Sequence, residues 1–279
     1  MELASEIERN VAAALAEDVG GGDLTSPLTP AGKTARAVVM CRKEAVICGQ
    51  AWFEATIRSL DARATVSWSA AEGTQVAAGN RICEIRGQAR TLLTAERVAL
   101  NFLQTLSGVA TVTRRYVEAI AGTRARIVDT RKTLPGLRLA QKYAVRVGGG
   151  SNHRLGLYDA MLIKENHIAA AGGIRQAITQ ARKLAQTGAW IQVEVENLDQ
   201  LKEALDAGAT MILLDNMSPD RMLEAVKIAG DRAELEASGG ITLENVRAIA
   251  ETGVHRISVG ALTKDVKAAD FSMRFESDS

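Results

Sequence analysis

The spacing of hydrophobic and polar positions changes along the chain and divides it into two parts. In the first part, helical spacing alternates with runs of β-branched and small apolar residues, which are typical of strands. The elements expected there are helices over 3–17, 50–59 and 94–120, and strands over 34–48 and 62–69. After residue 125, short apolar strands, polar turns and amphipathic helices repeat with little variation. The pattern predicts an α/β protein with two domains, the first ending near residue 110.

Six strands and four helices make up the repeating part. The strands are RIVD, AMLI, IQVEVE, MILLD, ELEAS and RISVG, and the helices cover 174–187, 198–207, 219–229 and 242–252. The last three helices are expected to be capped by Asn197 with Gln200, by Ser218 before Pro219, and by Thr242. Strands that alternate with helices predict parallel strands joined by crossover connections.

Polar residues or glycine stand where successive strands end. They are Lys164, Glu194, Asp215, Ser238 and Gly260. In a (β/α) barrel, the C-terminal ends of the strands form the rim that carries the active site. This placement favours a barrel over an open sheet.

The strand around Glu194 alternates polar residues with valine. Gln192, Glu194 and Glu196 therefore share one face, which fits a barrel interior, although a purely structural salt bridge is an open alternative. Asp215 follows the apolar run MILL and is expected beside Glu194. Two carboxylates at a rim suit a divalent metal or the stabilisation of a developing cation.

Two glycine-containing turns precede the last two helical segments. They are Ser238-Gly239-Gly240 and Val259-Gly260-Ala261. Small residues with free backbone N–H groups at a helix start match the phosphate sites of barrel enzymes. Each turn alone is weak evidence, and the pair predicts a ligand that carries a phosphate monoester.

The stretch from Thr130 to His167 is rich in positive charge, with seven Lys or Arg residues. Three recur every four residues and are interpreted as a solvated helix face: Arg138, Lys142 and Arg146. The other four stand where the chain changes structure, which favours contact with a ligand: Arg131, Lys132, Arg154 and Lys164. Such local bias in a near-neutral protein indicates a bound anion.

Composition limits the class of protein. With 279 residues, 47% of them hydrophobic, the chain can bury a large core. A net charge of +1 excludes wholesale nucleic-acid binding. The polar start MELASEIERN and the lack of a long apolar run predict a cytoplasmic protein without a membrane segment. Cys41, Cys48 and Cys83 show no C-x-x-C pair and are expected to be buried, reduced thiols.

Motifs along nearly the whole chain resemble those of the quinolinate phosphoribosyltransferases, the decarboxylating enzymes of NAD synthesis. They are GDLTS, TAERVALNFLQTLSGVAT, DTRKTLPGLRLAQKYAVRVGGGSNHRLGL, LIKENHI, VEVEN, LLDN, ASGGI and ISVGALT. The resemblance implies an N-terminal α/β sandwich over 1–110, a seven-stranded TIM-like barrel over 111–267, and a tail, 268–279, that returns to the first domain. The strand missing from our count of six is then expected around 144–151 or in the tail.

The resemblance also implies roles for residues. Quinolinate, pyridine-2,3-dicarboxylate, would meet Thr130, Arg131, Lys132, His153 and Arg154, with Arg97 supplied by the partner subunit of a homodimer. Phosphoribosyl pyrophosphate would place its 5-phosphate on Ser238, Gly239, Gly240, Val259, Gly260 and Ala261, with Lys164 facing its anionic end. Glu194 and Asp215 would hold Mg²⁺ and the ribose hydroxyls. The catalytic residues would be Lys132, Lys164, Glu194 and Asp215, and Glu196 is the alternative to Glu194.

Other functions share parts of this pattern. A relative associated with molybdate transport has a similar scaffold, and other transferases act on nicotinate without decarboxylation. A non-catalytic phosphate-binding barrel would keep both glycine turns but would not need paired carboxylates. The motifs TRK, NHR and LIKENH favour the quinolinate enzyme, because a dicarboxylate needs more cations than a monocarboxylate. Assembly beyond a dimer is left open.

Overall fold

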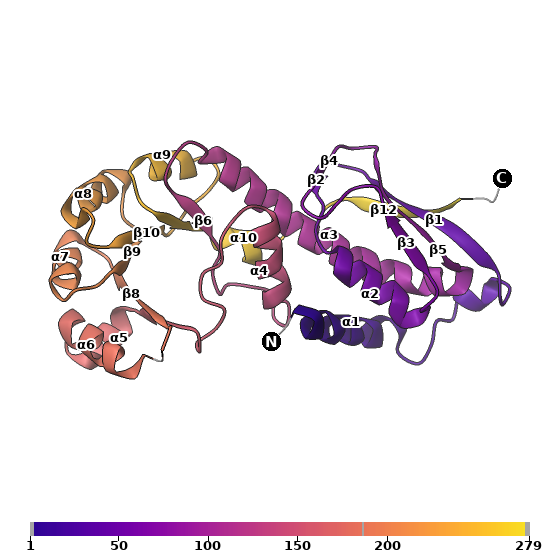
Figure 1. The fold of residues 1–279 in the computed structure, drawn as a ribbon, viewed down its shortest axis with the longest axis horizontal. Helices are drawn as coiled ribbons and strands as arrows, with labels where there is room; N and C mark the ends of the chain where they lie inside the picture. Colours follow the sequence, from indigo (N-terminus) through magenta and orange to yellow (C-terminus); the bar gives the residue numbers. More distant parts are fainter. Residues whose placement is uncertain (1–2, 186, 277–279) are drawn as a thin grey trace. The chain divides into compact units, whose positions relative to one another are not determined.

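The chain forms two compact units (Figure 1), and the computed structural model describes residues 3–185 and 187–276. The first unit draws on the ranges Met1–Arg114, Thr133–Gly149 and Thr263–Ser279, and the second on Arg115–Lys132 and Gly150–Leu262. The backbone therefore crosses between the units four times. Each unit combines segments that are far apart in the sequence.

An antiparallel sheet in the order β12-β1-β5-β3 organises the first unit. Its strands are β1 (Thr34–Cys41), β3 (Thr65–Trp68), β5 (Arg81–Gln88) and β12 (Phe271–Glu276). A small sheet pairs β2 (Ala45–Val46) with β4 (Gln75–Val76). The helices are α1 (Leu3–Val19), the short 3-10 helix η1 (Ser26–Leu28), α2 (Gln50–Leu60), α3 (Ala89–Ala119, up to Arg114) and α4 (Arg138–Val147).

One face of the antiparallel sheet carries the core of the first unit. Along β1, Ala37, Val39 and Cys41 are fully buried and belong to one apolar cluster with residues of α2 and α3. In β12, Phe271 lies opposite Cys41 and Met273 opposite Val39, and both join that cluster. Burying such a side chain stabilises a fold by about 1.5–3 kcal/mol. The last strand of the chain thus completes the core of the first unit.

A six-stranded parallel sheet in the order β6-β11-β10-β9-β8-β7 organises the second unit. The strands are β6 (Arg126–Val128), β7 (Ala160–Ile163), β8 (Trp190–Val195), β9 (Met211–Asp215), β10 (Glu234–Ser238) and β11 (Arg256–Ser258). The helices are α5 (Glu165–Ala171), α6 (Ile174–Leu184), α7 (Leu198–Asp206), α8 (Pro219–Ala229), α9 (Val246–Glu251) and α10 (Ala261–Lys264). In Figure 1, α6 to α9 lie along the outer side of the curved sheet.

The sheet is extended by a single residue beyond its six strands. Ser151 forms an isolated parallel bridge with Val128 of β6, and its N–H donates to the carbonyl of Ile127 at 2.8 Å. This bridge lies inside the stretch 144–151, where one more strand was expected. It supplies the seventh position of the barrel-like sheet without forming a full strand.

Most predicted elements of the second unit match the structure closely. Strands β7, β9 and β10 and helix α8 have the predicted bounds, because apolar runs with clear caps define them. At the start of α8, the Ser218 hydroxyl accepts from the N–H of Arg221 at 3.4 Å, and Pro219 is the first helical residue. The cap predicted at Thr242 is wrong: α9 begins at Val246, after Asn245, because residues between the Gly240 turn and Asn245 are not helical.

The prediction of a solvated face on the helix at 138–147 is wrong for Lys142. Lys142 is only 1% exposed, Arg138 is half-buried and donates to the Thr133 hydroxyl at 3.1 Å, and Arg146 is exposed. Helical spacing predicts which residues share a face, but neighbouring segments decide whether that face meets water. A buried lysine is rare and requires interactions within the protein.

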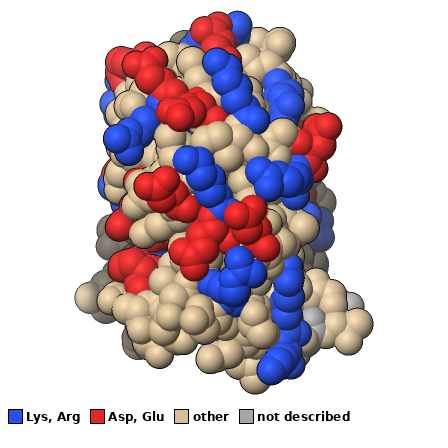
Figure 2. Space-filling view, turned by 90° about the vertical axis from the view of Figure 1, so that its left-hand side faces the viewer, with Lys and Arg blue, Asp and Glu red and all other residues tan. Residues whose placement is uncertain are grey.

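The outer helices carry mixed charge. Figure 2 shows positive and negative side chains interspersed on the side of the second unit where α6, α7 and α8 lie. Ion pairs contribute to this mixture, including Arg232 with Asp206 at 3.6 Å. Among the described residues, none of the helices is both long enough and apolar enough to span a membrane.

Candidate active site

Strand register places three of the predicted rim residues, Glu194, Asp215 and Ser238, on one face of the parallel sheet. Glu194 of β8 pairs with Leu213 of β9, and Asp215 pairs with Ser238 of β10. Side chains two residues apart in a strand share a face, so all four point to the same side of the sheet. Gln192, two residues before Glu194, is completely buried on that side. The rim, meaning the C-terminal ends of β6 to β11 and the loops that follow, therefore opens above a buried interior.

Three cations and a histidine, which we call the cationic cluster, occupy one part of the rim: Arg131, Lys132, Arg154 and His153. Two segments supply it, because the bridge at Ser151 brings the second loop beside β6. Asp129 joins the segments, since its fully buried carboxylate accepts from the N–H of His153 at 2.9 Å and from the side chain of Asn152. Sequence reasoning missed Asp129, although an acid directly between an apolar strand and TRK was a usable signal.

Arg154 is held close to a second guanidinium. It is 9% exposed, and its Nη1 donates to the carbonyl of Ala160 at 3.3 Å. Burial lowers the pKa of Arg154, the charge of Arg131 lowers it further, and Asp159 opposes both effects. A buried cation beside a second cation favours a ligand with more than one anionic group.

The loop after Arg154 is shaped by the carboxylate of Asp159. It accepts from the backbone N–H of Leu155 at 2.7 Å and of Gly156 at 2.9 Å. The tip of this loop leaves Leu157 and Tyr158 more than 70% exposed. Arg154 is therefore followed by a loop in which the backbone N–H groups of Leu155 and Gly156 are satisfied locally.

Glu194 and Lys164 form an ion pair across β7 and β8. Lys164 Nζ lies 2.8 Å from Glu194 Oε2, and the carboxylate is 9% exposed. Burial raises the pKa of Glu194, the Lys164 bond lowers it, and the charges of Asp215 and Glu165 raise it again. The predicted neighbourhood of Glu194 and Asp215 is thus present in the structure. A small cavity of about 140 Å³ adjoins it, lined by Glu165, Ile168, Ala169, Glu194, Glu196 and Gln200.

Within the described ranges there is no cluster of three or more His, Cys, Asp or Glu side chains able to hold a metal ion. The rim does carry two carboxylates on neighbouring strands, Glu194 on β8 and Asp215 on β9. Mg²⁺ often binds one or two carboxylates and takes its other oxygens from water and substrate phosphates. The two carboxylates therefore match the ligands that Mg²⁺ takes from a protein.

The turn Ser238-Gly239-Gly240 is built against Asn216. Asn216 has a left-handed backbone with φ 53°, and its N–H donates to the carbonyl of Ser238 at 2.9 Å. Gly239 and Gly240 have φ values of 98° and 59°, and a Cβ on Gly239 would collide with the Asn216 side chain and backbone. After the turn, Asn245 Nδ2 donates a hydrogen bond to the Gly240 carbonyl at 2.9 Å. Sequence reasoning missed both asparagines.

The second turn, Val259-Gly260-Ala261, lies against the loop after β6. The N–H of Val259 donates to the carbonyl of Val128 at 3.0 Å. A Cβ on Gly260 would lie 3.3 Å from Lys132 Cδ and 3.7 Å from Thr130 Oγ1. The glycine therefore lets the stem of Lys132 pass close to the turn. Lys132, a member of the cationic cluster, and Thr130 therefore lie beside this second turn.

Arg97 belongs to the first unit, where it is exposed on α3. The other predicted site residues belong to the second unit. Nearby on α3, the hydroxyl of Thr94 donates to Asp23 at 2.8 Å, which ties the GDLTS loop to this helix.

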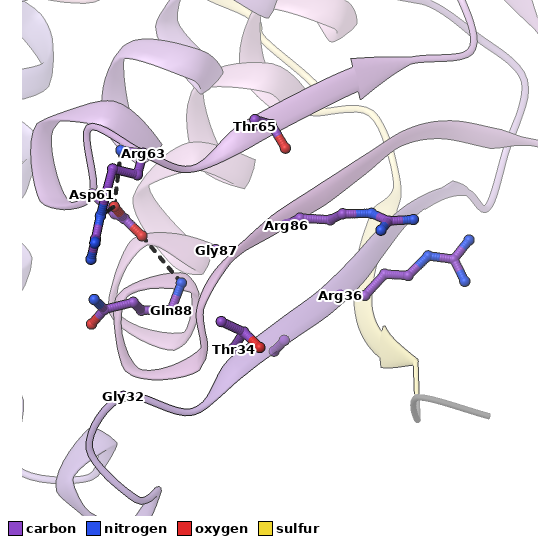
Figure 3. A pocket seen from close by; sticks show the side chains of 10 residues that line it. Gly32, Thr34, Arg36, Asp61, Arg63, Thr65, Arg86, Gly87 and Gln88 are labelled. Atoms are coloured by element: carbon purple, nitrogen blue, oxygen red, sulfur yellow. Dashed lines mark hydrogen bonds and ion pairs between the residues drawn. The ribbon is translucent and has the colours of Figure 1, made fainter.

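A larger cavity of about 630 Å³ lies in the first unit, on the charged face of its sheet (Figure 3). Arg36 and Arg86 pair directly across β1 and β5, and Glu84 bonds to both, at 2.6 and 2.9 Å. These arginines, Arg36 first, lower the pKa of Glu84 to about 2. The arginines of this cavity already face acids, so the rim of the second unit is the stronger candidate for the active site.

Fold and rim together define an α/β barrel-like protein with a cationic cluster and two carboxylates at one rim. Sequence models described as the N-terminal and C-terminal domains of quinolinate phosphoribosyl transferase match residues 23–107 and 109–274. The chain is 44% identical over 257 residues to a probable nicotinate-nucleotide pyrophosphorylase (carboxylating) of Bacillus subtilis, covering 92% of this chain and 89% of that protein.

Two further relatives agree with these matches. A quinolinate phosphoribosyltransferase (decarboxylating) of Nicotiana glauca is 38% identical over 285 residues, covering 95% of this chain and 81% of that protein. The structure of the nicotinate-nucleotide pyrophosphorylase from Francisella tularensis matches with a TM-score of 0.96 and 46% identity, covering 99% of this chain and 98% of that one. The chain therefore belongs to the quinolinate phosphoribosyltransferase family, a family of enzymes.

Proposed function

We propose that this enzyme transfers a phosphoribosyl group from phosphoribosyl pyrophosphate to quinolinate and releases CO₂ and pyrophosphate. The product would be nicotinate mononucleotide, an intermediate of NAD synthesis. The observation that carries the proposal is the division of the rim by charge. The charge of Arg131 acts on the buried Arg154 guanidinium at one part of the rim, while the carboxylates of Glu194 and Asp215 act on each other at another. The first pair suits a dicarboxylate, and the second suits a sugar that becomes cationic.

The cationic cluster would bind the two carboxylates of quinolinate. The guanidinium groups of Arg131 and Arg154 can each form two parallel hydrogen bonds to a carboxylate. Lys132 adds a third cation beside Thr130, whose hydroxyl accepts from the Lys132 N–H at 3.0 Å. His153 Nδ1 accepts a hydrogen bond from the backbone N–H of the neighbouring Arg154. Arg97 of the partner subunit would complete the set in a homodimer.

The two turns would receive the 5-phosphate of phosphoribosyl pyrophosphate. Their glycines present backbone N–H groups without side chains that would block a close approach. Lys164, which forms an ion pair with Glu194, would also contact the anionic end of the substrate. Mg²⁺ held by Glu194 and Asp215 would neutralise charge on the departing pyrophosphate.

Chemistry at the sugar would rely on charge rather than on a covalent nucleophile. As pyrophosphate leaves, positive charge develops on the ribose ring, and the carboxylates of Glu194 and Asp215 stabilise it. The pyridine nitrogen of quinolinate then forms the bond to C1 of the ribose. The resulting pyridinium stabilises the electron pair left on C2 when the 2-carboxylate departs as CO₂, and a proton from solvent then takes the place of that carboxylate. A cytoplasmic location accords with this role.

The proposal is tested by following CO₂ release from quinolinate labelled at the 2-carboxylate. We expect release only when phosphoribosyl pyrophosphate and Mg²⁺ are both present, and loss of release when a chelator removes the metal. Release without phosphoribosyl pyrophosphate, or none with both present, would contradict the proposed reaction. The second outcome would favour a non-catalytic or transport-associated role.

Discrimination between quinolinate and nicotinate is the next prediction. Nicotinate lacks the 2-carboxylate, so it would leave part of the cationic cluster uncompensated and lose charge-assisted hydrogen bonds worth about 1.5–3 kcal/mol each. We expect nicotinate to bind at least about 100-fold more weakly, which corresponds to about 2.7 kcal/mol. The difference should shrink in Lys132→Met and Arg154→Gln. Titrations at fixed ionic strength measure this, and equal affinity of the parent enzyme for both acids would refute the substrate assignment.

Gly239→Ala tests the first turn. The new Cβ would meet Asn216 and force an L residue to a φ of 98°, so we expect a stability loss of about 1–3 kcal/mol and a raised KM for phosphoribosyl pyrophosphate. Gly122→Ala is the matched control, because Gly122 has a φ of 81° but no atom within 4 Å of its Cβ position. Thermal unfolding and steady-state kinetics separate the two effects. An equal change of KM in both variants would show that the turn does not bind the phosphate.

A further inference from the structure

A chain of polar side chains runs through the buried interior of the second unit, below the rim. It consists of Arg256 on β11, Glu236 on β10, Gln192 on β8 and His153 on the loop after Ser151. Glu236 and Gln192 are completely buried, His153 is 7% exposed, and the Arg256 side chain is 14% exposed. Branched apolar residues usually fill this part of a parallel barrel. We call these four residues the interior chain.

Each bond of the interior chain has a defined direction. Arg256 Nε donates to Glu236 Oε2 at 2.9 Å, and Gln192 Nε2 donates to the same oxygen at 3.1 Å. Because the Gln192 amide turns its NH₂ group to the carboxylate, its Oε1 faces His153 Nε2 at 3.0 Å. The other oxygen of Glu236 lies 3.6 Å from His153 Nε2, beyond hydrogen-bond length.

A hydrogen bond at Nδ1, on the opposite side of the imidazole, determines which ring nitrogen of a neutral His153 carries the proton. The backbone N–H of Arg154 donates to His153 Nδ1 at 2.8 Å. A backbone N–H is always a donor, so Nδ1 must present a lone pair. The proton of a neutral His153 then resides on Nε2 and is donated to Gln192. Addition of a second proton would set two donors against each other at Nδ1.

Trp190 fixes the plane of the imidazole. The two rings meet edge to face, with centroids 5.0 Å apart and planes at 78°. The Arg256 guanidinium lies 5.9 Å from the centre of the same Trp190 ring. Arg256, at one end of the interior chain, therefore contacts the same Trp190 ring that packs against His153 at the other end.

We propose that Gln192 and Glu236 are positioning residues for quinolinate, acting through His153. They hold His153 as the neutral Nε2–H tautomer, so that Nδ1 accepts from the Arg154 N–H and sets the backbone from which the Arg154 side chain enters the cationic cluster. Asp129 anchors the His153 N–H on the other side. His153 thus contributes to substrate binding by orienting Arg154. The kinetic part of this proposal rests on the proposed function, and the part concerning the tautomer does not.

Burial of the Arg256–Glu236 pair argues against a role in stability alone. Removing two charges from water is unfavourable, and well-packed apolar residues of similar volume are often as stable or more stable. A directed series of hydrogen bonds, in contrast, allows only one arrangement of donors and acceptors. In a neutral His153, that arrangement leaves the lone pair on Nδ1, the ring nitrogen that accepts from the Arg154 N–H.

The tautomer is measured by NMR of the histidine side chains, which is tractable because the chain has only three histidines. In ¹⁵N-labelled protein, we expect His153 to show a protonated Nε2 and an unprotonated Nδ1 at neutral pH. His153→Gln identifies its signals. A protonated Nδ1 or an imidazolium in the parent protein would overturn the proposal, whatever the activity with quinolinate.

The kinetic test compares Gln192→Leu and Glu236→Gln with a control. In both variants, we expect the KM for quinolinate to rise about 10-fold or more, with kcat and the KM for phosphoribosyl pyrophosphate changing much less. Ser258→Ala is the control, since Ser258 is a 6% exposed residue of the same sheet whose hydroxyl donates to the Ala237 carbonyl at 3.2 Å. It should leave both KM values unchanged.

Two variants keep the test decisive. Glu236→Gln preserves shape and volume, so it remains informative if Gln192→Leu does not fold. An unchanged KM for quinolinate in a folded variant with altered His153 signals would overturn the positioning role. If the parent enzyme does not use quinolinate, the proposed function fails, while the NMR measurement still decides whether the interior chain sets the tautomer.

Discussion

Replacing Glu194 by Gln is expected to lower kcat about 100-fold or more, the scale for losing one preorganised electrostatic group in an active site. Gln keeps the volume of the side chain but removes its charge. That charge matters most when the ribose becomes cationic, so we expect a modest change in quinolinate affinity. Lys164, which lies 2.8 Å from the carboxylate in the parent, would lose its ion-pair partner as well.

Glu196→Gln is the matched control for Glu194→Gln. Glu196 lies two residues further along and is exposed beyond the end of β8. Steady-state kinetics at saturating substrates should show near-normal turnover for this control. Near-normal turnover in Glu194→Gln together with a large loss in Glu196→Gln would assign the role to Glu196.

The pH dependence of kcat gives a second measurement on the same residue. The pKa of Glu194 is raised, by burial first. As pH falls through this raised pKa, the carboxyl takes up a proton and loses the charge that stabilises the transition state. We therefore expect kcat to fall on the acid side at a pH above the usual range for glutamate. This limb should be missing from the residual activity of Glu194→Gln.

Mixing two inactive variants should restore activity if neighbouring subunits share a site. Arg97→Ala and Arg131→Ala are each expected to be inactive alone. A mixed dimer would contain one site that lacks both arginines and one intact site. Random exchange of equal amounts should recover about a quarter of the parent activity, because half of the dimers are mixed and half of their sites are intact.

A mixture of Arg131→Ala with Arg154→Ala is the matched control. Both residues belong to the cationic cluster of one subunit, so every site in every mixed dimer lacks one of them. Native mass spectrometry can demonstrate that subunits have exchanged. Exchange without recovered activity in the Arg97 mixture, or equal recovery in the control, would contradict a site shared through Arg97.

Local signals in the sequence were sufficient for much of the second unit. MILLD and ELEAS are apolar runs of strand length, and they form β9 and β10 with the predicted bounds. The spacing of polar residues at strand ends placed Glu194, Asp215 and Ser238 on one face of the sheet, as the register confirms. Such predictions succeed because side-chain alternation and helix capping depend on residues close together in the chain.

Residues whose roles depend on distant partners were not predicted. The lysine at position 142 was assigned to a solvated face, because helical periodicity cannot show which neighbours will cover it. Ser151 pairs through one residue, too short a segment to produce a strand pattern. Asn216 supports the turn at Gly239, more than twenty residues later, through a left-handed backbone that single-sequence reasoning did not anticipate.

The sequence by itself determined the class of fold, the order of strands and helices in the second unit, and the family, because these follow from local periodicity and from motifs that keep their order. Only the tertiary structure decided how Asp129 joins the two cationic segments and how Glu236 and Gln192 reach His153. Hydrogen bonds of this kind connect different strands and loops. Their partners are selected when the sheet register brings them within about 3 Å, and no spacing along the chain encodes that distance.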